Sequence, residues 1–489
     1  MSAKKRNSGK NKGKGPRRGV SGNPQRRAEQ LAGAPDGASH NSVGQDSGAV
    51  MRDLAFRMAG GTEPAPWWPE SHERVLDRAR TAVWPSDPVE VEDLTSQIVG
   101  DELHDCVRRY TGGHHPAQWL VALAEAAGAA LRTALGAGDT EDDTGWRGLW
   151  SLLCGIALTA PGATGDDAEG ASLLARQYSL PAVKDPRETA LAEAGQAAKL
   201  LADRGADTGT LAGAADGGGG CRPAGAPLVA RDSYGSRFLL AAPFTYEGTE
   251  GETHWYAWDV DACWIDEVAG AGSFGSAAGA LAEWRDAVGP AADGAELAEC
   301  PPELAARLLR QPLETGPFSQ LMRGDEPREL LREYYRQRRR ARELSASLGD
   351  LTGGAFVVDL DQAREEFCAW YAARHGRDTV AGGMAEAVDT ITDQWGPHKD
   401  IDDRAFFACS PHRIETAARL IRNGHYAEHA GPAIRLLPEW TRWCAERGGL
   451  SGDAAVRARG AALSAAAALA DASAAVSDHP DPGLFRRPE

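Results

Sequence analysis

The stretch 205–226 (GADTGTLAGAADGGGGCRPAGA) divides this chain, because it contains four consecutive glycines and few side chains large enough to join a core. Glycine and other small residues at this density favour a flexible linker over a helix or a strand. We therefore predict a domain boundary at 205–226. The sequence has helical patterns before this linker and strand patterns directly after it.

Residues 51–204 carry the signals of several helices. Apolar residues recur at helical spacing over 88–110, and a proline suited to the first helical turn opens the segment 116–136. We predict an all-helical domain over 51–204. Its most apolar runs, 117–135 and 146–160, are interrupted by charged residues, which indicates buried helices and no membrane span.

Residues 227–350 begin with two strand-like segments, 237–246 and 253–266, which are rich in aromatic residues and separated by EGTEGE. This pattern predicts a β-hairpin. In its second strand, alternation places Tyr256, Trp258 and Val260 on one face and Asp259, Asp261 and Cys263 on the other. Helices are predicted over 276–288, 302–310 and 326–348, so 227–350 is expected to be a small α+β unit followed by an Arg-rich helix.

Residues 351–477 return to helical patterns. Asp359 and Gln362 fit a helix start and Gly376 fits the stop, and Ser410-Pro411 is a cap followed by a first-turn proline. Further helices are predicted over 438–447 and 453–476, and 478–489 is expected to be a disordered tail. The predicted fold class is mainly α and multidomain, with helical N- and C-terminal domains and a small central α+β unit formed by a β-hairpin plus a helix.

The net charge of −17 conceals a division between the first residues and the rest. Residues 1–30 contain ten Lys or Arg and one Glu, a net charge of +9, whereas the other 459 residues contain 43 basic and 69 acidic side chains, a net charge of −26. Residues 1–50 lack a periodic apolar pattern, which predicts a disordered basic arm. The acidic remainder excludes a uniformly basic nucleic-acid-binding domain.

Two basic segments are candidates for contact with phosphates. The arm has no aromatic residue for stacking on bases, so its binding would be independent of sequence and sensitive to salt. The helix around 336–342 has five Arg in seven residues, and these would contact nucleic acid or form salt bridges with acids of the body. The candidate residues are Lys4, Lys5, Arg6, Lys10, Lys12, Lys14, Arg17, Arg18, Arg336, Arg338, Arg339 and Arg340. Docking of the arm on the acidic body is the competing interpretation.

Asp259 and Asp261 are the first candidates for a metal site, because alternate residues of a strand lie about 6–7 Å apart on one face. A metal-dependent hydrolase or phosphodiesterase centred on this pair is the alternative function. A solvent-facing strand surface is the competing interpretation. His425 and His429 form an H-x-x-E-H pattern, but Gly424 and Gly431-Pro432 leave a short helix for it, so a polar helix corner is favoured.

Two further motifs lack the context that their chemistry needs. Gly270–Gly275 matches G-x-G-x-x-G, but no second strand ending in an acid follows it. A flexible turn, with Ser276 or Ser273 capping the helix that follows, is therefore favoured over a nucleotide site. Cys409 and His412 would form a nucleophile and base, whereas the neighbouring Phe406-Phe407 favours a buried thiol.

These observations favour a non-enzymatic interaction protein. We expect its helical domains to bind a protein partner, still unknown, and its basic arm to contact nucleic acid or another polyanion. No catalytic residues, cofactor or membrane contact are predicted. Residues 1–30 lack the apolar segment of an export signal, and the eight Cys form no C-x-x-C pair, so we expect a cytoplasmic protein with reduced thiols.

Overall fold

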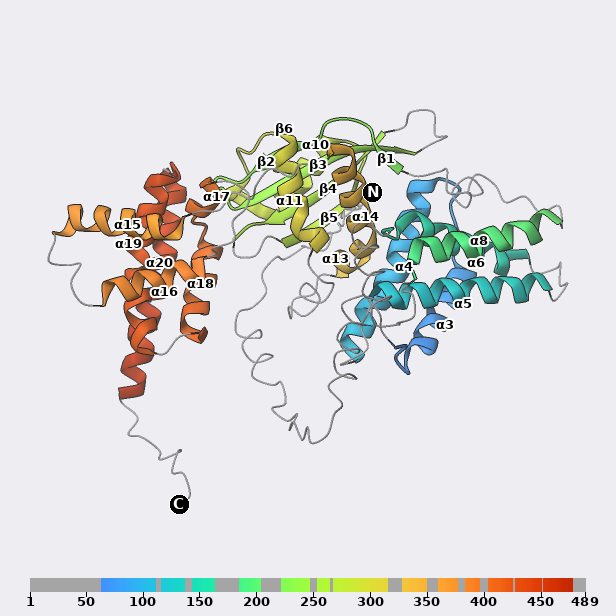
Figure 1. Cartoon of the computed structure of the whole chain (residues 1–489), viewed down its shortest axis with the longest axis horizontal. Helices are drawn as coiled ribbons and strands as arrows, with labels where there is room; N and C mark the ends of the chain where they lie inside the picture. The colour runs from blue at the N-terminus through green and yellow to red at the C-terminus, as the bar shows by residue number, and fades with distance from the viewer. Residues whose placement is uncertain are drawn as a thin grey trace, which may run out of the picture. The chain divides into compact units, whose positions relative to one another are not determined.

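The computed structural model describes residues 63–110, 116–136, 143–162, 184–203, 221–246, 253–263, 267–314, 328–349, 359–376, 383–395, 403–424, 427–450 and 452–477. These residues belong to one compact unit, Asn41–Glu489. In the described part of the chain there are fifteen α-helices and a small antiparallel sheet, which confirms the predicted mainly α fold (Figure 1). The arm, the tail and most of the predicted linker lie outside the described residues.

The N-terminal helices follow the predicted pattern closely. Asp87 caps one of them by accepting hydrogen bonds from the backbone N–H groups of Val89 and Glu90, and a proline occupies its first turn. The helices of this group are α3 (Trp68–Thr81), α4 (Pro88–Arg109), α5 (Pro116–Gly136), α6 (Asp143–Thr159) and α8 (Pro186–Asp203). They gather in one bundle whose apolar sides form a shared core (Figure 1).

Helix α5 is the most apolar of these helices. Of the helices described, it is the one that is long and apolar enough to cross a membrane by length and composition. Half of that stretch is buried inside the protein, and Trp119, Leu123 and Leu131 are almost completely buried in the core. Its packing against α6 and α8 is the arrangement expected of a central bundle helix.

The predicted hairpin forms the centre of a six-stranded antiparallel sheet. Strands β3 (Arg237–Tyr246) and β4 (Thr253–Asp261) pair with Arg237 opposite Asp261 and Phe244 opposite His254. The path of the sheet is β5-β4-β3-β2-β6, and β1 pairs with β3. The other strands are β1 (Cys221–Pro223), β2 (Leu228–Arg231), β5 (Glu267–Phe274) and β6 (Ala298–Glu299). The sequence pattern does not predict these four strands, and β1 occupies part of the predicted linker.

Both faces of the sheet are covered. Tyr256, Trp258 and Val260 belong to the core that also contains the N-terminal bundle. On the other face, Ala257 packs with Trp284 of α10 (Ala277–Val288). The expectation that this second face meets solvent is therefore wrong, because α10 covers it. Ser276 caps α10 as predicted, but Gly270 and Gly272 lie in strand β5 and not in a turn.

The Arg-rich region is interrupted, unlike the continuous helix predicted over 326–348. Helix α11 (Pro302–Glu314) precedes it, and α13 (Arg328–Arg332) is separated from α14 (Tyr334–Leu348) at Glu333. Helix α14 lies against α4, α11 and strand β1. This position between the bundle and the sheet explains why most of its side chains are buried.

A second core lies among the C-terminal helices. Trp395, Trp440, Trp443 and Phe367 are almost completely buried in it. Its helices are α15 (Leu360–His375), α16 (Met384–Trp395), α17 (Asp403–Phe407), α18 (Pro411–Gly424), α19 (Ala427–Arg447) and α20 (Gly452–Ser477). Helices α16 and α17 are not predicted by the sequence pattern. Helix α19 begins eleven residues before the predicted start and contains both Pro432 and Pro438. The predicted division into domains stays a prediction.

Gly100 permits the close packing of α4 on α13. A Cβ atom at this position would lie 2.3 Å from the Cα atom of Arg332, a backbone atom that no side-chain rotation can move away. We expect Gly100→Ala to lower the free energy of unfolding by about 2–3 kcal/mol, as overpacking does. Gly195→Ala in α8 is the matched control, because a Cβ atom at this position would have no neighbour within 4 Å. This change should raise the free energy of unfolding by about 0.5–1 kcal/mol, because alanine has less backbone freedom than glycine in the unfolded chain. Urea denaturation measures the change in unfolding free energy for each variant. Equal changes in Gly100→Ala and Gly195→Ala would contradict the close packing of α4 on α13.

Candidate functional site

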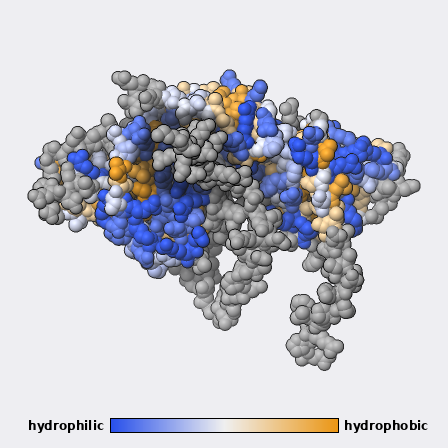
Figure 2. Space-filling model, turned by 180° about the vertical axis from the view of Figure 1, so that it is seen from behind, coloured by the Kyte–Doolittle hydropathy of each residue, from blue (hydrophilic) through white to orange (hydrophobic). Residues whose placement is uncertain are grey.

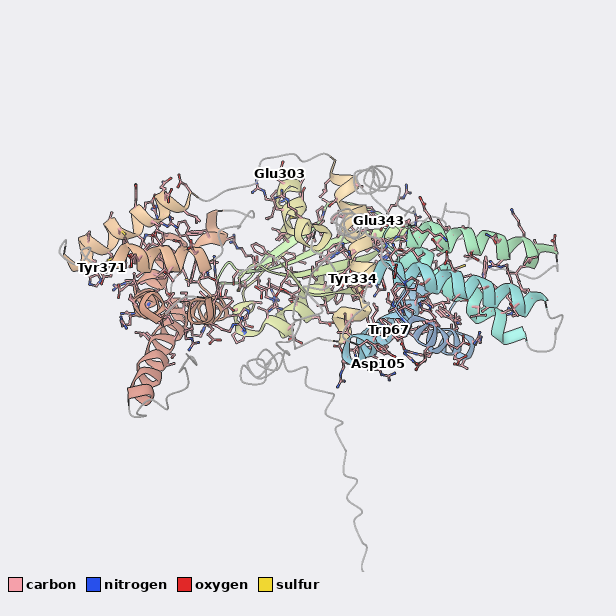
Figure 3. All side chains as sticks on the ribbon, turned by 60° about the horizontal axis from the view of Figure 1, so that its bottom comes forward. Trp67, Asp105, Glu303, Tyr334, Glu343 and Tyr371 are labelled. Carbon is pink, nitrogen blue, oxygen red and sulfur yellow. The ribbon has the colours of Figure 1, made fainter. Side chains whose placement is uncertain are left out.

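The predicted basic segment of α14 lies largely inside the protein. Arg336, Arg339 and Arg340 are 3%, 3% and 0% exposed. Each guanidinium is paired with acids: Glu333 and Asp93 for Arg336, Glu343 for Arg339, and Glu92 and Glu343 for Arg340. Figure 3 labels Glu343 on α14, close to the N-terminal helices. Buried and paired guanidinium groups cannot reach a phosphate at the surface.

The structure therefore favours the salt-bridge interpretation for Arg336, Arg339 and Arg340 over the predicted contact with nucleic acid. The physical reason is the position of α14, which has the bundle on one side and the sheet on another. Arg338 is half-buried, and its guanidinium lies 5.9 Å from the centre of the Tyr334 ring. The predicted arm residues, Lys4 to Arg18, lie outside the described residues.

Asp259 is held by two partners. Its carboxylate accepts hydrogen bonds from Nε and one terminal nitrogen of Arg237, at 2.7 and 2.6 Å, and from the indole N–H of Trp284 at 2.9 Å. The Asp259 side chain is 12% exposed. A metal ion would have to displace a bidentate arginine from it. The predicted pair of Asp259 and Asp261 is therefore not assembled as one metal site, because the two carboxylates have different partners.

Asp261 instead approaches Cys263 and His412. The Cys263 backbone N–H donates to Oδ1 of Asp261 at 2.8 Å, and Nε2 of His412 lies 3.8 Å from Oδ2. The Cys263 thiol lies 3.3 Å from the hydroxyl of Ser410, which also accepts from the backbone N–H of Arg413 at the start of α18. One ligand atom from each of Asp261, Cys263 and His412 falls within 4.8 Å of the other two.

Burial and charge set the ionisation of Asp261. Burial alone raises the pKa of its carboxyl group, but the charges of His412 and Arg237 and the hydrogen bonds from Cys263 together outweigh this effect, so the pKa is lowered from its usual value. Asp261 is 7% exposed and Cys263 is 6% exposed, whereas the His412 side chain is 59% exposed. The three residues thus form a polar cluster with a buried carboxylate and thiol and a histidine that faces solvent.

Alternation predicts that Asp261 and Cys263 share one strand face, and the spacing at the start of the following helix pairs His412 with Cys409. In the structure Cys409 is completely buried in the C-terminal core, where burial raises the pKa of its thiol to about 12, whereas the His412 side chain is 59% exposed beside Asp261. A thiol in this state favours the predicted inert role over a nucleophile. No short-range pattern could have linked His412 to β4, because the two lie far apart in the sequence.

The histidine motif is described only in part. His429 belongs to α19, and His425 lies outside the described residues. The G-x-G-x-x-G segment contributes Gly270 and Gly272 to strand β5, whose partner is the antiparallel β4. An edge strand paired in this way lacks the strand–helix crossover that a nucleotide site requires, which supports the interpretation without a nucleotide.

Two buried histidines make the stability of the fold depend on pH. Burial lowers the pKa of His254 to about 3, helped by the charges of Arg340 and Arg336. Burial also lowers the pKa of His72 to about 4, against its hydrogen bond to the Trp119 carbonyl. The unfolded chain takes up protons near pH 6.5 and the folded chain does not, so stability is present above this pH and falls as the pH falls.

We expect each of these histidines to cost about 2 kcal/mol of unfolding free energy between about pH 8 and pH 5. His254→Phe keeps an aromatic ring beside Phe244 and Tyr246. It should remove the part of the pH dependence of the unfolding free energy that His254 contributes. His375→Gln, a change at an exposed histidine, is the control. Urea denaturation across this pH range measures the slope. A slope unchanged by His254→Phe would refute the buried neutral state.

No family model, curated protein or solved structure matches this chain.

Proposed function

We propose that this chain is a cytoplasmic interaction protein, in which residues 1–30 bind nucleic acid or another polyanion and the helical part binds a protein partner. The charge division carries the proposal: a segment of net charge +9 precedes a remainder of net charge −26. Binding by such a segment depends on charge and releases counterions, so it requires no folded recognition surface.

The pairing of the body's arginines supports this assignment. Arg336, Arg339 and Arg340 are neutralised within the protein, so the dense basic run of α14 does not compete with the arm for a polyanion. Among the coloured residues on the face drawn in Figure 2, most are hydrophilic and the apolar patches are smaller. An acidic, hydrophilic body repels phosphate, which leaves the arm as the segment suited to contact it.

Helix α20 supports the protein-binding part of the proposal. Ala454, Ala458 and Ala462 bury one side of this helix in the C-terminal core. Val456 and Leu463 lie on the opposite side and are 70% and 51% exposed. In this proposal the protein partner covers these two exposed apolar side chains.

The hydrolase alternative depends on Asp259 and Asp261 acting together. The bidentate contact of Arg237 with Asp259 opposes that arrangement, so we give precedence to the interaction function. The deciding experiment compares the full chain with residues 31–489 for binding to a fluorescent DNA duplex at low salt. Retention by the full chain alone supports the proposal, and equal retention of both rejects its polyanion part.

A further inference from the structure

The cluster of Asp261, Cys263 and His412 combines three ligand types that favour the same metal. Thiolate, imidazole and carboxylate are the protein ligands of zinc, usually in a tetrahedral arrangement. Alkaline earth ions prefer oxygen ligands alone, so a thiol in the set points away from calcium and magnesium. Among the described residues, this is the group of three such side chains whose ligand atoms all lie within 4.8 Å of one another.

The spacing of the cluster suits a zinc ion. Bonds of about 2.0–2.3 Å in a tetrahedral site place ligand atoms about 3.3–3.8 Å apart. Nε2 of His412 lies 3.8 Å from Oδ2 of Asp261, so a shift of about 0.3–0.5 Å would bring these two atoms to the separation of about 3.3–3.5 Å that nitrogen and oxygen ligands of zinc require. The other carboxylate oxygen, Oδ1, is already oriented by the backbone N–H of Cys263. Outer hydrogen bonds of this kind fix a ligand before the metal arrives.

The surroundings of the cluster hold its ligands in place. The backbone N–H of Ala262 donates to the carbonyl of Ser236 at 2.8 Å, which anchors the chain between Asp261 and Cys263. His412 lies in the first turn of α18, after the Ser410 cap. The cluster therefore joins the end of β4 to the start of α18 through two locally anchored segments.

The charges also balance. A thiolate and a carboxylate with a neutral histidine carry a total charge of −2, which a divalent ion neutralises. The neighbouring cation, Arg237, is compensated by its pair with Asp259 at 2.6 Å. Because the His412 side chain is 59% exposed, a metal ion can enter from solvent while Asp261 and Cys263 remain buried.

We propose that Asp261, Cys263 and His412 bind a zinc ion that links the sheet to the C-terminal helices. Three protein ligands leave the fourth position to water, the arrangement of an open zinc site. The site is independent of the basic arm and therefore of the polyanion binding proposed above. It also differs from the predicted Asp259 and Asp261 pair, because it uses only one of those carboxylates.

Cobalt titration of the full chain tests this site. After treatment with a chelator and a thiol reductant, we expect one Co²⁺ per chain, with the visible bands of a tetrahedral ion, a thiolate-to-metal absorption in the near ultraviolet, and displacement by Zn²⁺. Loss of a ligand in Cys263→Ser or His412→Ala should weaken binding at least about 100-fold. His412 lies at the surface, so its variant keeps the test valid if Cys263→Ser fails to fold.

The controls replace the same residue types elsewhere. Cys368→Ser changes a half-buried thiol, and His375→Ala changes an exposed histidine, and both should bind cobalt like the original chain. Zinc should raise the melting temperature of the original chain and of these controls, but not that of His412→Ala. Absence of the thiolate band, or binding that survives both ligand substitutions and so places the metal elsewhere, for example at His425 and His429, would overturn the proposal.

Discussion

The affinity of the full chain for a DNA duplex is expected to fall about 1000-fold between about 50 and 200 mM salt, as it does when about six cationic side chains contact phosphates. The chain that lacks residues 1–30 should show no measurable binding over this range. The physical reason is counterion release, which depends on the ten Lys and Arg of this segment and not on base sequence. Fluorescence anisotropy at several salt concentrations gives the slope.

The control keeps the length of the arm and removes its charge. A full chain in which the arm's basic residues are replaced by Gln should bind as weakly as the truncated one. Duplexes of unrelated sequence should bind the original chain with equal affinity, because the arm has no aromatic residue for stacking. A nearly flat salt dependence, or truncation without effect, would mean that the arm docks on the acidic body instead.

The helices could be predicted where their ends carry local chemistry. Pro116 and Gly136 bound α5 as expected, and the side chain of Asp359 accepts from the backbone N–H of Gln362 at the start of α15. Caps and turn residues act within a few residues of the chain, so the sequence displays them directly. The hairpin was predictable for the same reason, because its strands are adjacent in sequence and its pattern alternates.

Features that depend on tertiary contacts could not be predicted in this way. Strand β5 contains Gly270 and Gly272, residues with low strand propensity, and it forms because β4 offers it a partner. The Arg-rich helix has the composition of a surface helix, and only the packed structure shows that acids from α4 surround it.

The candidate site illustrates the same division. Alternation along β4 predicts that Asp259, Asp261 and Cys263 share one face of the strand. Two of these residues, Asp261 and Cys263, belong to the cluster with His412, and Asp259 does not. Alternation holds along β4, but Arg237 and Trp284 bind the Asp259 carboxylate and so keep it from the cluster that Asp261 and Cys263 form with His412. The contribution of His412 depends on the tertiary contact between the start of α18 and the end of β4, which no local pattern encodes.

Arg340→Ala is expected to lower the free energy of unfolding by about 3–5 kcal/mol, because it leaves a buried carboxylate without its counter-charge. The side chains of Arg340 and Glu92 are both 0% exposed, and one guanidinium nitrogen lies 2.7 Å from each oxygen of Glu92. The same nitrogen donates to the hydroxyl of Tyr246 at 2.8 Å. Arg459→Ala, an exposed arginine of α20, should change stability by less than about 0.5 kcal/mol.

A double variant separates the value of the pair from the cost of breaking it. In Glu92→Leu with Arg340→Leu, neither charge is buried, so we expect most of the stability lost in Arg340→Ala to return. If the double variant recovers the full unfolding free energy of the original chain, the pair determines the orientation of α14 between α4 and β3 and adds little to stability. Urea denaturation of Glu92→Leu, Arg340→Leu and the double variant closes the cycle. A small loss in Arg340→Ala would contradict the buried pair, because an unpaired carboxylate at 0% exposure has no water to solvate it.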